Sequence, residues 1–437
     1  MLYPSQQEIL DETKGKNRVA YYLGCGAGKT YIGSEKLMSF EKDHNLVICQ
    51  KSKVQDWVNH FKENYPDTFV WDMTAAGKDA QFMPGVTVIN YDLAFRRPNL
   101  LKQKNFALLL DESSLIQNLG AKRTKFILKM NPSNVVLLSG TPVSAGQLDK
   151  EKGLIFGKYE NLISQLNLLG WEISKKDFLD RYCNWELREL AIKSTGEIRR
   201  FKEILSYKNI TELNARLKTL GAVFRKTSDI VDLPEYDDQT FYVKSIPQYR
   251  KMQKEGIVEV NGDLLVGDMP ITKLLRLRQL CAAYNSEKES VLKDLLESLE
   301  NERVIVFYNF KDELELIKKA VGDRPFYQIN GDVKDWDERT WTNEFNAVVA
   351  AQYQSGSHGH NMQAAKYIIY MSPTNSAELF EQSRGRIRRN GQKAERVMYY
   401  HIICRNSVEE RILSKVRRGV DYTLDDYIAE YERTDEL

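Results

Sequence analysis

The chain has 437 residues, more than one ordinary hydrophobic core holds, which predicts two or three domains. Its content of 42% hydrophobic and 28% charged residues is typical of soluble globular proteins. The net charge of +2 gives no general signal for nucleic acid, so any site for a polyanion must be local. The five cysteines are scattered, which argues against a zinc site or a disulfide framework and favours a reducing compartment.

The beginning of the chain, "MLYPSQQEIL", lacks the basic and then apolar layout of a signal peptide. No apolar run approaches the roughly 20 residues that a membrane span needs. The sequence therefore predicts a cytoplasmic protein without a membrane partner.

Residues 1–145 alternate short apolar runs with amphipathic stretches. The runs are expected to form buried strands at Arg18–Leu23, Asn45–Gln50, Val86–Asn90, Phe106–Asp111 and Asn134–Gly140. Such alternation predicts an α/β lobe in which helices cover both faces of a parallel sheet.

The pattern changes beyond this lobe. Residues 146–228 mix charged and aromatic residues with helical character, and we interpret them as a helical insertion on the first lobe. Residues 229–245 include the acidic, proline-containing "DIVDLPEYDD", which predicts an extended connector. Residues 246–437 are expected to form a second parallel-sheet lobe with a C-terminal helix. Its expected strands are Arg303–Phe310, Pro325–Gly331, Ala347–Gln352, Lys366–Ser372 and Arg396–Ile403.

The stretch "LGCGAGKT" follows the first expected strand and precedes a helix. Gly26 and Gly28 allow a tight turn that points successive N–H groups at one spot, next to a helix N-terminus. Lys29 would reach the β- and γ-phosphates of ATP, and the Thr30 hydroxyl would bind Mg²⁺. The alternative is a glycine loop with a chance Gly-Lys-Thr.

The stretch "LLLDESS" places two carboxylates at the carboxyl end of an expected strand, where α/β sheets bind ligands. Asp111 would hold Mg²⁺, and Glu112 would orient and deprotonate the attacking water. An acidic pair that caps the next helix is the alternative. In "LLSGTPV", Ser139 and Thr141 are candidates to bond the Asp111–Ser114 loop, unless they only form a turn before proline.

The stretch "QSRGRIRRNGQ" crowds Arg384, Arg386, Arg388 and Arg389 together, which requires an anion nearby. That anion is a protein carboxylate, a nucleic-acid backbone or a nucleotide phosphate. Arg386 and Arg389 are three residues apart and would share a helix face, so we predict that both reach a γ-phosphate. A solvated basic helix end and direct DNA contact are the alternatives.

The ordered set of motifs resembles superfamily 2 helicases and, within them, the Swi/Snf-like DNA translocases, including small phage members. Further matching segments are "LYPSQ", "LVICQKSKVQDWVNHF", "VFRKTSDIVDLPEY" and "QSGSHGHNMQAA". In "DESSLIQN", Ser113 and Ser114 stand where the family has Ala-His. The resemblance covers nearly the whole chain and implies two tandem RecA-like lobes.

The resemblance also implies site residues. Gln6 would read adenine, and the nucleotide would further contact a set made of Gly24, Gly26, Ala27, Gly28, Lys29, Thr30 and Gln382. Nucleic-acid contacts pass to Lys51, Ser52, Lys53, Thr141, Gly356 and Asn361. Lys51 and Lys53 equally fit ordinary surface lysines. His358 and His360 form a His-x-His pair, but without a further ligand nearby the loop interpretation is preferred.

The favoured function is a DNA-stimulated ATPase that uses ATP and Mg²⁺ to move on duplex DNA with little sequence preference, in replication, recombination or repair. We expect a compact, monomeric motor of a bacterium or phage. One alternative is a helicase that separates strands of DNA or RNA. Another is a catalytically silent scaffold that binds nucleic acid.

Overall fold

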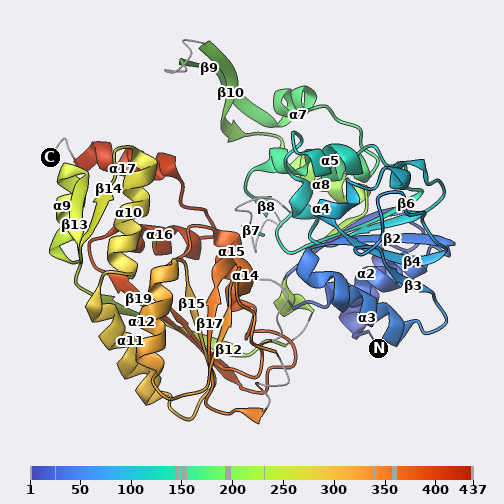
Figure 1. Cartoon of the computed structure of the whole chain (residues 1–437). Coiled ribbons are helices and arrows are strands. Elements are labelled where there is room, and N and C mark those ends of the chain that lie inside the picture. Colours follow the sequence, from blue (N-terminus) through green and yellow to red (C-terminus); the bar gives the residue numbers. More distant parts are fainter. Residues whose placement is uncertain are drawn as a thin grey trace. The chain divides into compact units, whose positions relative to one another are not determined.

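The computed structural model describes residues 2–24, 26–142, 147–148, 155–191, 198–230, 232–337, 341, 343–356 and 362–434. The chain divides into two compact units, Met1–Val231 and Asp232–Leu437. Each unit is built around its own parallel β-sheet (Figure 1). The fold class predicted from the sequence, two tandem α/β lobes, is confirmed.

The sheet of the first unit has seven strands in the order β11-β1-β6-β5-β2-β4-β3, and all neighbours pair in parallel. The strands are β1 (Arg18–Leu23), β2 (His44–Cys49), β3 (Val70–Asp72), β4 (Gly85–Asn90), β5 (Ala107–Leu110), β6 (Asn134–Ser139) and β11 (Ala222–Arg225). Non-consecutive neighbours require crossovers, which the helices supply.

Alternation along β1 explains why both faces of this sheet are covered. Val19, Tyr21 and Leu23 join one apolar core, while Ala20 and Tyr22 join the core on the opposite face. The first core packs against α1 (Pro4–Glu12), α2 (Lys29–Met38) and α3 (Val54–Asn64). The opposite core packs against α4 (Tyr91–Ala94), α5 (Lys122–Ile127), α6 (Ile163–Leu168), α7 (Lys175–Tyr182) and α8 (Ile210–Thr219).

The segment 146–228 differs from the helical insertion that the sequence predicts. Besides α6, α7 and α8 it contains a hairpin of β9 (Cys183–Ala191) and β10 (Ile198–Tyr207), which reaches away from the sheet of its own unit (Figure 1). It also contains the short pair β7 (Gln147–Leu148) and β8 (Ile155–Phe156), and β11, which joins the main sheet beside β1. The β9–β10 strands pair only with each other, so they need no continuous apolar run, which is the signal that the sequence analysis sought.

The sheet of the second unit has six strands in the order β12-β19-β18-β15-β17-β16, again all parallel. They are β12 (Glu235–Val243), β15 (Val304–Tyr308), β16 (Phe326–Ile329), β17 (Val348–Gln352), β18 (Tyr367–Tyr370) and β19 (Arg396–Cys404). A separate hairpin joins β13 (Ile257–Val260) to β14 (Asp263–Val266). The helices are α9 (Pro247–Glu255), α10 (Pro270–Ala282), α11 (Ser286–Ser298), α12 (Lys311–Val321), α14 (Tyr353–Gly356), α15 (Ala377–Arg384), α16 (Val408–Arg417) and α17 (Leu424–Thr434).

The expected connector at residues 229–245 is mostly strand β12, which pairs with β19 over nine residues. The sequence did not predict this strand, because its acidic side chains are of a type that is depleted in strands. The charges are compensated in the fold: Arg396 bridges Glu235 and Asp237, and Asp238 lies 3.5 Å from Arg384.

All ten strands predicted from apolar runs are present, with ends shifted by at most a few residues. Among the described residues, no helix is both long enough and apolar enough to span a membrane.

His60 of α3 links its own helix to α2, the helix that begins at the end of the glycine-rich loop. Its Nε2 lies 2.8 Å from the Ser34 hydroxyl of α2, and its ring meets Tyr31 edge-on at 4.8 Å. Burial lowers the pKa of His60 to about 4, so the fold favours the neutral imidazole.

We expect this histidine to make unfolding depend on pH. The unfolded chain takes up the proton near pH 6.5 and the folded chain only near pH 4, so stability falls as the pH drops between these values. Urea unfolding of the wild type and of His60→Gln at several pH values measures this. The free-energy difference between them should shrink from pH 7 to pH 4, and a constant difference would contradict the assignment.

Candidate functional site

The loop after β1 has the backbone that its glycines predict. Gly26 (φ 82°) and Gly28 (φ 77°) adopt left-handed conformations, which other residues enter only at a cost. Gly28 is also the N-cap of α2, and a Cβ placed on it would lie 2.2 Å from Nε2 of Gln6. Both backbone angle and space therefore require glycine at this position.

Lys29 is the first residue of α2 and lies over the loop. Its Nζ donates hydrogen bonds to the carbonyl oxygens of Leu23 at 3.0 Å and Gly24 at 3.2 Å. A Cβ on Gly140, which follows β6, would lie 3.3 Å from the same ammonium group. The ammonium group is therefore held at the carboxyl edge of the sheet, between the ends of β1 and β6.

Gln6 lies against the same loop. It is buried, its Nε2 donates to the carbonyl of Ala27 at 3.1 Å, and its Oε1 accepts from the backbone N–H of Tyr3 at 2.9 Å. The structure thus joins the N-terminal helix to the glycine-rich loop, two segments that the sequence analysis connected only through resemblance.

The acidic pair follows β5, and only β6 separates that strand from β1. An Asp111 carboxylate oxygen, Oδ2, accepts from Nε1 of Trp57 at 2.8 Å, and its backbone carbonyl accepts from the Tyr91 hydroxyl at 2.8 Å. Burial raises the pKa of Asp111 and the neighbouring Glu112 raises it further, whereas the Trp57 bond lowers it. Trp57 and Tyr91 are supporting residues whose contacts to Asp111 no sequence signal revealed.

Glu112 has two unusual features. Its backbone is left-handed (φ 52°, ψ 60°), a strained conformation of the kind found at functional sites. Its Oε2 is buried and has no hydrogen-bond partner among the described residues. The carboxylates of Asp111 and Glu112 and the hydroxyl of Thr30 follow β5 and β1 at the same edge of the sheet. Carboxylate and hydroxyl oxygens are the donors that Mg²⁺ prefers, so these residue types fit that ion.

Gln165 of α6 joins three segments that the sequence analysis treated separately. It is fully buried, and its Oε1 accepts from the hydroxyls of Tyr22 at 2.9 Å and Ser113 at 2.8 Å. Its Nε2 donates to the carbonyl of Pro142 at 2.8 Å. The side-chain amide of Gln165 therefore bonds three segments at once: the strand before the glycine-rich loop, the acidic loop and the turn after β6.

The bonds predicted between the Asp111–Ser114 loop and the residues Ser139 and Thr141 stay a prediction. Ser139 accepts from the backbone N–H of Thr141 at 3.1 Å, which stabilises their own turn. Pro142 of the same turn is linked to the acidic loop, because Gln165 bonds both Ser113 and the Pro142 carbonyl, and Gln117 donates to that carbonyl at 3.2 Å. In the sequence, the sign of the Gln165 network is a single glutamine in the apolar segment "NLISQLNLLG".

The arginine-rich segment belongs to the second unit and is only partly helical. Because α15 ends at Arg384, the prediction that Arg386 and Arg389 share a helix face is wrong. They lie in the turns that follow. Arg386 is 7% exposed and donates from Nε to the carbonyl of Gln382 at 3.1 Å, whereas Nε of Arg389 is buried without a hydrogen-bond partner among the described residues.

The residues proposed to contact nucleic acid also follow strands. Lys51, Ser52 and Lys53 form a 3₁₀ turn after β2, with the first two exposed and Lys53 paired with Asp56 at 2.8 Å. Thr141 follows β6, and Gly356 ends α14 after β17. Asn361, His358 and His360 lie outside the described residues.

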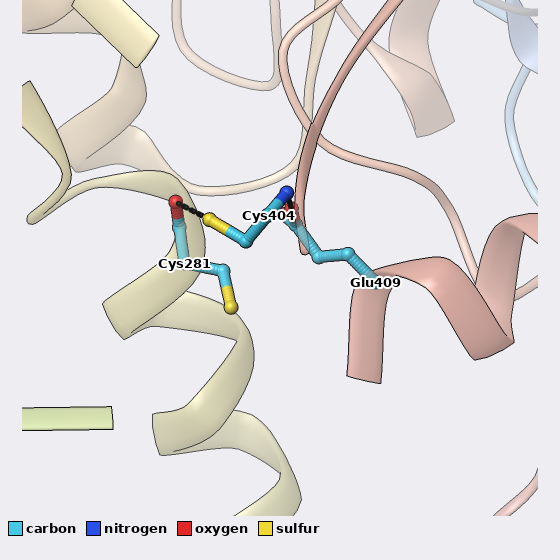
Figure 2. A group of neighbouring side chains, drawn as sticks. All are labelled: Cys281, Cys404 and Glu409. Carbon is cyan, nitrogen blue, oxygen red and sulfur yellow. Dashed lines mark hydrogen bonds between the residues drawn. The ribbon is translucent and has the colours of Figure 1, made fainter. Parts of the chain in front are cut away.

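A buried cluster of Cys281, Cys404 and Glu409 in the second unit has ligand atoms close enough to suggest a metal site (Figure 2). The carboxylate of Glu409 is already engaged, however. One oxygen accepts from the Lys288 ammonium at 2.8 Å and the other from the backbone N–H of Cys404 at 3.0 Å. Burial also raises the pKa of the Cys281 thiol. With a cation already in place, we assign this cluster a structural role that joins α10, α11, α16 and β19.

Comparison with protein families finds two matches along the chain. Residues 16–286 match the model of the SNF2-related domain, and residues 287–391 match the helicase conserved C-terminal domain. The first match alone covers more than half of the chain.

Curated relatives are distant. An uncharacterized ATP-dependent helicase of Mycoplasma pneumoniae is 23% identical over 92% of this chain and 39% of that protein. A human SWI/SNF-related regulator of chromatin (subfamily A member 1) is 22% identical over 89% and 40%, and the yeast DNA repair and recombination protein RAD54 is 22% identical over 94% and 54%. The chain thus spans about two fifths to one half of the length of these relatives.

Among solved structures, the SWI2/SNF2 ATPase core of Sulfolobus solfataricus in complex with dsDNA is similar with a TM-score of 0.43 and 17% identity. It covers 95% of this chain and 91% of that one.

The Gln165 network generates a stability prediction. Gln165→Leu keeps a side chain of similar size but leaves the hydroxyls of Tyr22 and Ser113 without their partner, while the Pro142 carbonyl keeps only its bond from Gln117. Each buried group left unpaired costs about 1–3 kcal/mol, so we expect a clear loss in the free energy of unfolding. Chemical denaturation measures it. The solvent-exposed Gln55→Leu on α3 is the control, and equal stability of the two variants would contradict the assignment.

Proposed function

Because the chain belongs to the SNF2-related family of helicase-type ATPases, we propose that it hydrolyses ATP with Mg²⁺ and uses the cycle to move along duplex DNA. The observation that carries the proposal is the carboxyl edge of the first sheet. There the loop with Lys29 and Thr30 follows β1, and the pair Asp111 and Glu112 follows β5, with only β6 between the two strands.

Each group at this edge has a distinct task in the proposal. The N–H groups of the loop from Gly24 to Thr30 surround the phosphates, and Lys29 exchanges its carbonyl partners for β- and γ-phosphate oxygens. Thr30 and Asp111 hold Mg²⁺, which neutralises phosphate charge when bound. Glu112 orients the attacking water and accepts its proton, a role that its unpaired Oε2 supports.

The remaining nucleotide contacts come from both units in this proposal. Gln6, already bound to the loop through Ala27, reads the adenine, and Gln382 contacts the nucleotide. Arg386 and Arg389 bring guanidinium groups to the γ-phosphate. Arginines in this role accelerate related phosphoryl transfers by roughly 10³–10⁵-fold. The buried, unpaired Nε of Arg389 supports such a role, because a phosphate oxygen would satisfy it.

Contacts to DNA are proposed for Lys51, Ser52, Lys53, Thr141, Gly356 and Asn361. They would reach the phosphate backbone, so binding carries little sequence information and weakens strongly with salt. The names of two relatives support DNA as the partner and a role in recombination or repair: one is a DNA repair and recombination protein and another is a regulator of chromatin. The expected phage source has no such support, since the relatives named above come from a bacterium and from eukaryotes.

The decisive measurement is the rate of ATP hydrolysis with no nucleic acid, single-stranded DNA, duplex DNA, forked DNA and RNA. We expect the greatest stimulation by duplex DNA. Lys29→Ala should abolish turnover because the β- and γ-phosphates lose their cation. The control is Lys42→Ala, since Lys42 is half-buried and the bond that the structure describes for its ammonium group goes to the side chain of Asn105, before β5.

The alternatives give different outcomes. A translocase displaces a third strand from a triplex without opening a tailed duplex, whereas a strand-separating helicase opens the tailed duplex. A silent scaffold binds DNA but releases no phosphate, with Lys29→Ala identical to the wild type. Either of the last two results would replace the proposed function.

A further inference from the structure

The four crowded arginines do not share one kind of partner. Arg386 and Arg389 are the candidates for the γ-phosphate, but Arg384 and Arg388 are bound by β12 within the second unit. Nε of Arg388 donates to the carbonyl of Pro234 at 2.9 Å. Arg384 lies 3.5 Å from the carboxylate of Asp238, so part of the positive charge is neutralised inside the protein.

The ring of Tyr236 is the centre of this contact. The guanidinium carbons of Arg384 and Arg388 each lie 4.7 Å from its centroid, so the ring binds both cations. Arg384 also lies 4.6 Å from the ring centroid of Tyr399 on β19, and its side chain is only 15% exposed. Cation–π contacts are stronger when they are removed from water, as Arg384 is here.

Asp238 is itself held firmly. His401 of β19 lies 3.2 Å from one of its carboxylate oxygens, and Arg417 of α16 bonds the same oxygen. Burial alone would raise the pKa of Asp238, but the nearby His401 and the charges of Arg417 and Arg384 outweigh it and lower the pKa. Asp238 therefore remains a charged anchor for Arg384 at neutral pH.

Strand β12 lies at the point where the chain enters the second unit. The boundary between the units falls between Val231 and Asp232, and Pro234 and Tyr236 come directly after it. Arg388 and Arg384 thus fasten the arginine-rich segment to the point where the chain enters the second unit. The segment that carries Arg386 and Arg389 begins immediately after α15, at the same contact.

We propose that Arg384 and Arg388 are positioning residues that hold the end of α15 against β12 through Tyr236 and Asp238. They do not touch the nucleotide. They fix the turns that carry Arg386 and Arg389, and they make these turns follow any shift of the chain where it enters the second unit. This inference rests on the proposed function, because Arg386 and Arg389 are its candidate phosphate contacts.

Steady-state kinetics of DNA-stimulated ATP hydrolysis test the inference. Arg384→Ala, Arg388→Ala and Tyr236→Ala should each lower kcat on the order of tenfold to hundredfold, the effect of a small misplacement of catalytic groups. KM for ATP should stay within about twofold, because the phosphate loop in the first unit is unchanged. Tyr236→Phe keeps the ring and should retain most of the wild-type kcat.

Arg396→Ala is the matched control. Arg396 binds the same strand through Glu235 and through Asp237 at 2.9 Å, but these side chains alternate with Tyr236 and Asp238 and have no described bond to α15. We expect kcat close to that of the wild type. If Arg396→Ala lowers kcat as much as Tyr236→Ala, or if all variants keep the wild-type kcat, the inference is wrong.

Amide hydrogen exchange tests the contact between β12 and the arginine-rich segment independently of ATPase activity. Amides of residues 384–392 should exchange faster in Tyr236→Ala than in the wild type, and Arg396→Ala should leave them unchanged. Unaltered exchange in Tyr236→Ala would overturn the inference. A wild-type chain that shows the expected exchange but hydrolyses no ATP would instead contradict the proposed function and leave the contact established.

Discussion

The parallel pairing of strands is the constraint on which the candidate site depends. Parallel strands end at one edge of a sheet, so residues far apart in the sequence are brought together without long loops. In the first unit this edge carries the loop with Lys29, the carboxylates of Asp111 and Glu112, and the turn with Thr141. Crossover helices packed on both faces keep the edge in register.

Buried hydrogen bonds turn this common edge into a defined arrangement. The side chains of Gln165 and Trp57 reach the acidic loop from α6 and α3, on opposite faces of the sheet. Each has partners that would be costly to leave unpaired, so the loop has little freedom to shift independently of the helices. In the second unit, the arginine-rich segment is contacted by the ring of Tyr236, which lies against Arg384 and Arg388, and by the carboxylate of Asp238, which pairs with Arg384.

Apolar strands and the glycine-rich loop were predictable because their signals are local. A buried strand is recognised from its own apolar residues, and the role of Gly28 is recognised from its place between a strand and a helix. The acidic strand β12 was not predictable, because its stability comes from partners more than 140 residues away, such as Arg384 and Arg396. Gln165 was missed for the same reason, since its role exists only where three distant segments meet. The end of α15 at Arg384 was not predicted either, because the spacing of Arg386 and Arg389 was interpreted as if the helix continued through them.

The bonds between Lys29 and the carbonyls of its own loop have a consequence for the kinetics of ligand entry. Through these bonds the flexible side chain of Lys29 stabilises the backbone at Leu23 and Gly24, where the loop begins. An incoming anion then meets a preformed cradle, and only one ammonium group has to swing toward it. Little conformational entropy is lost on association, so capture and release can be rapid, as repeated cycles of ATP hydrolysis require.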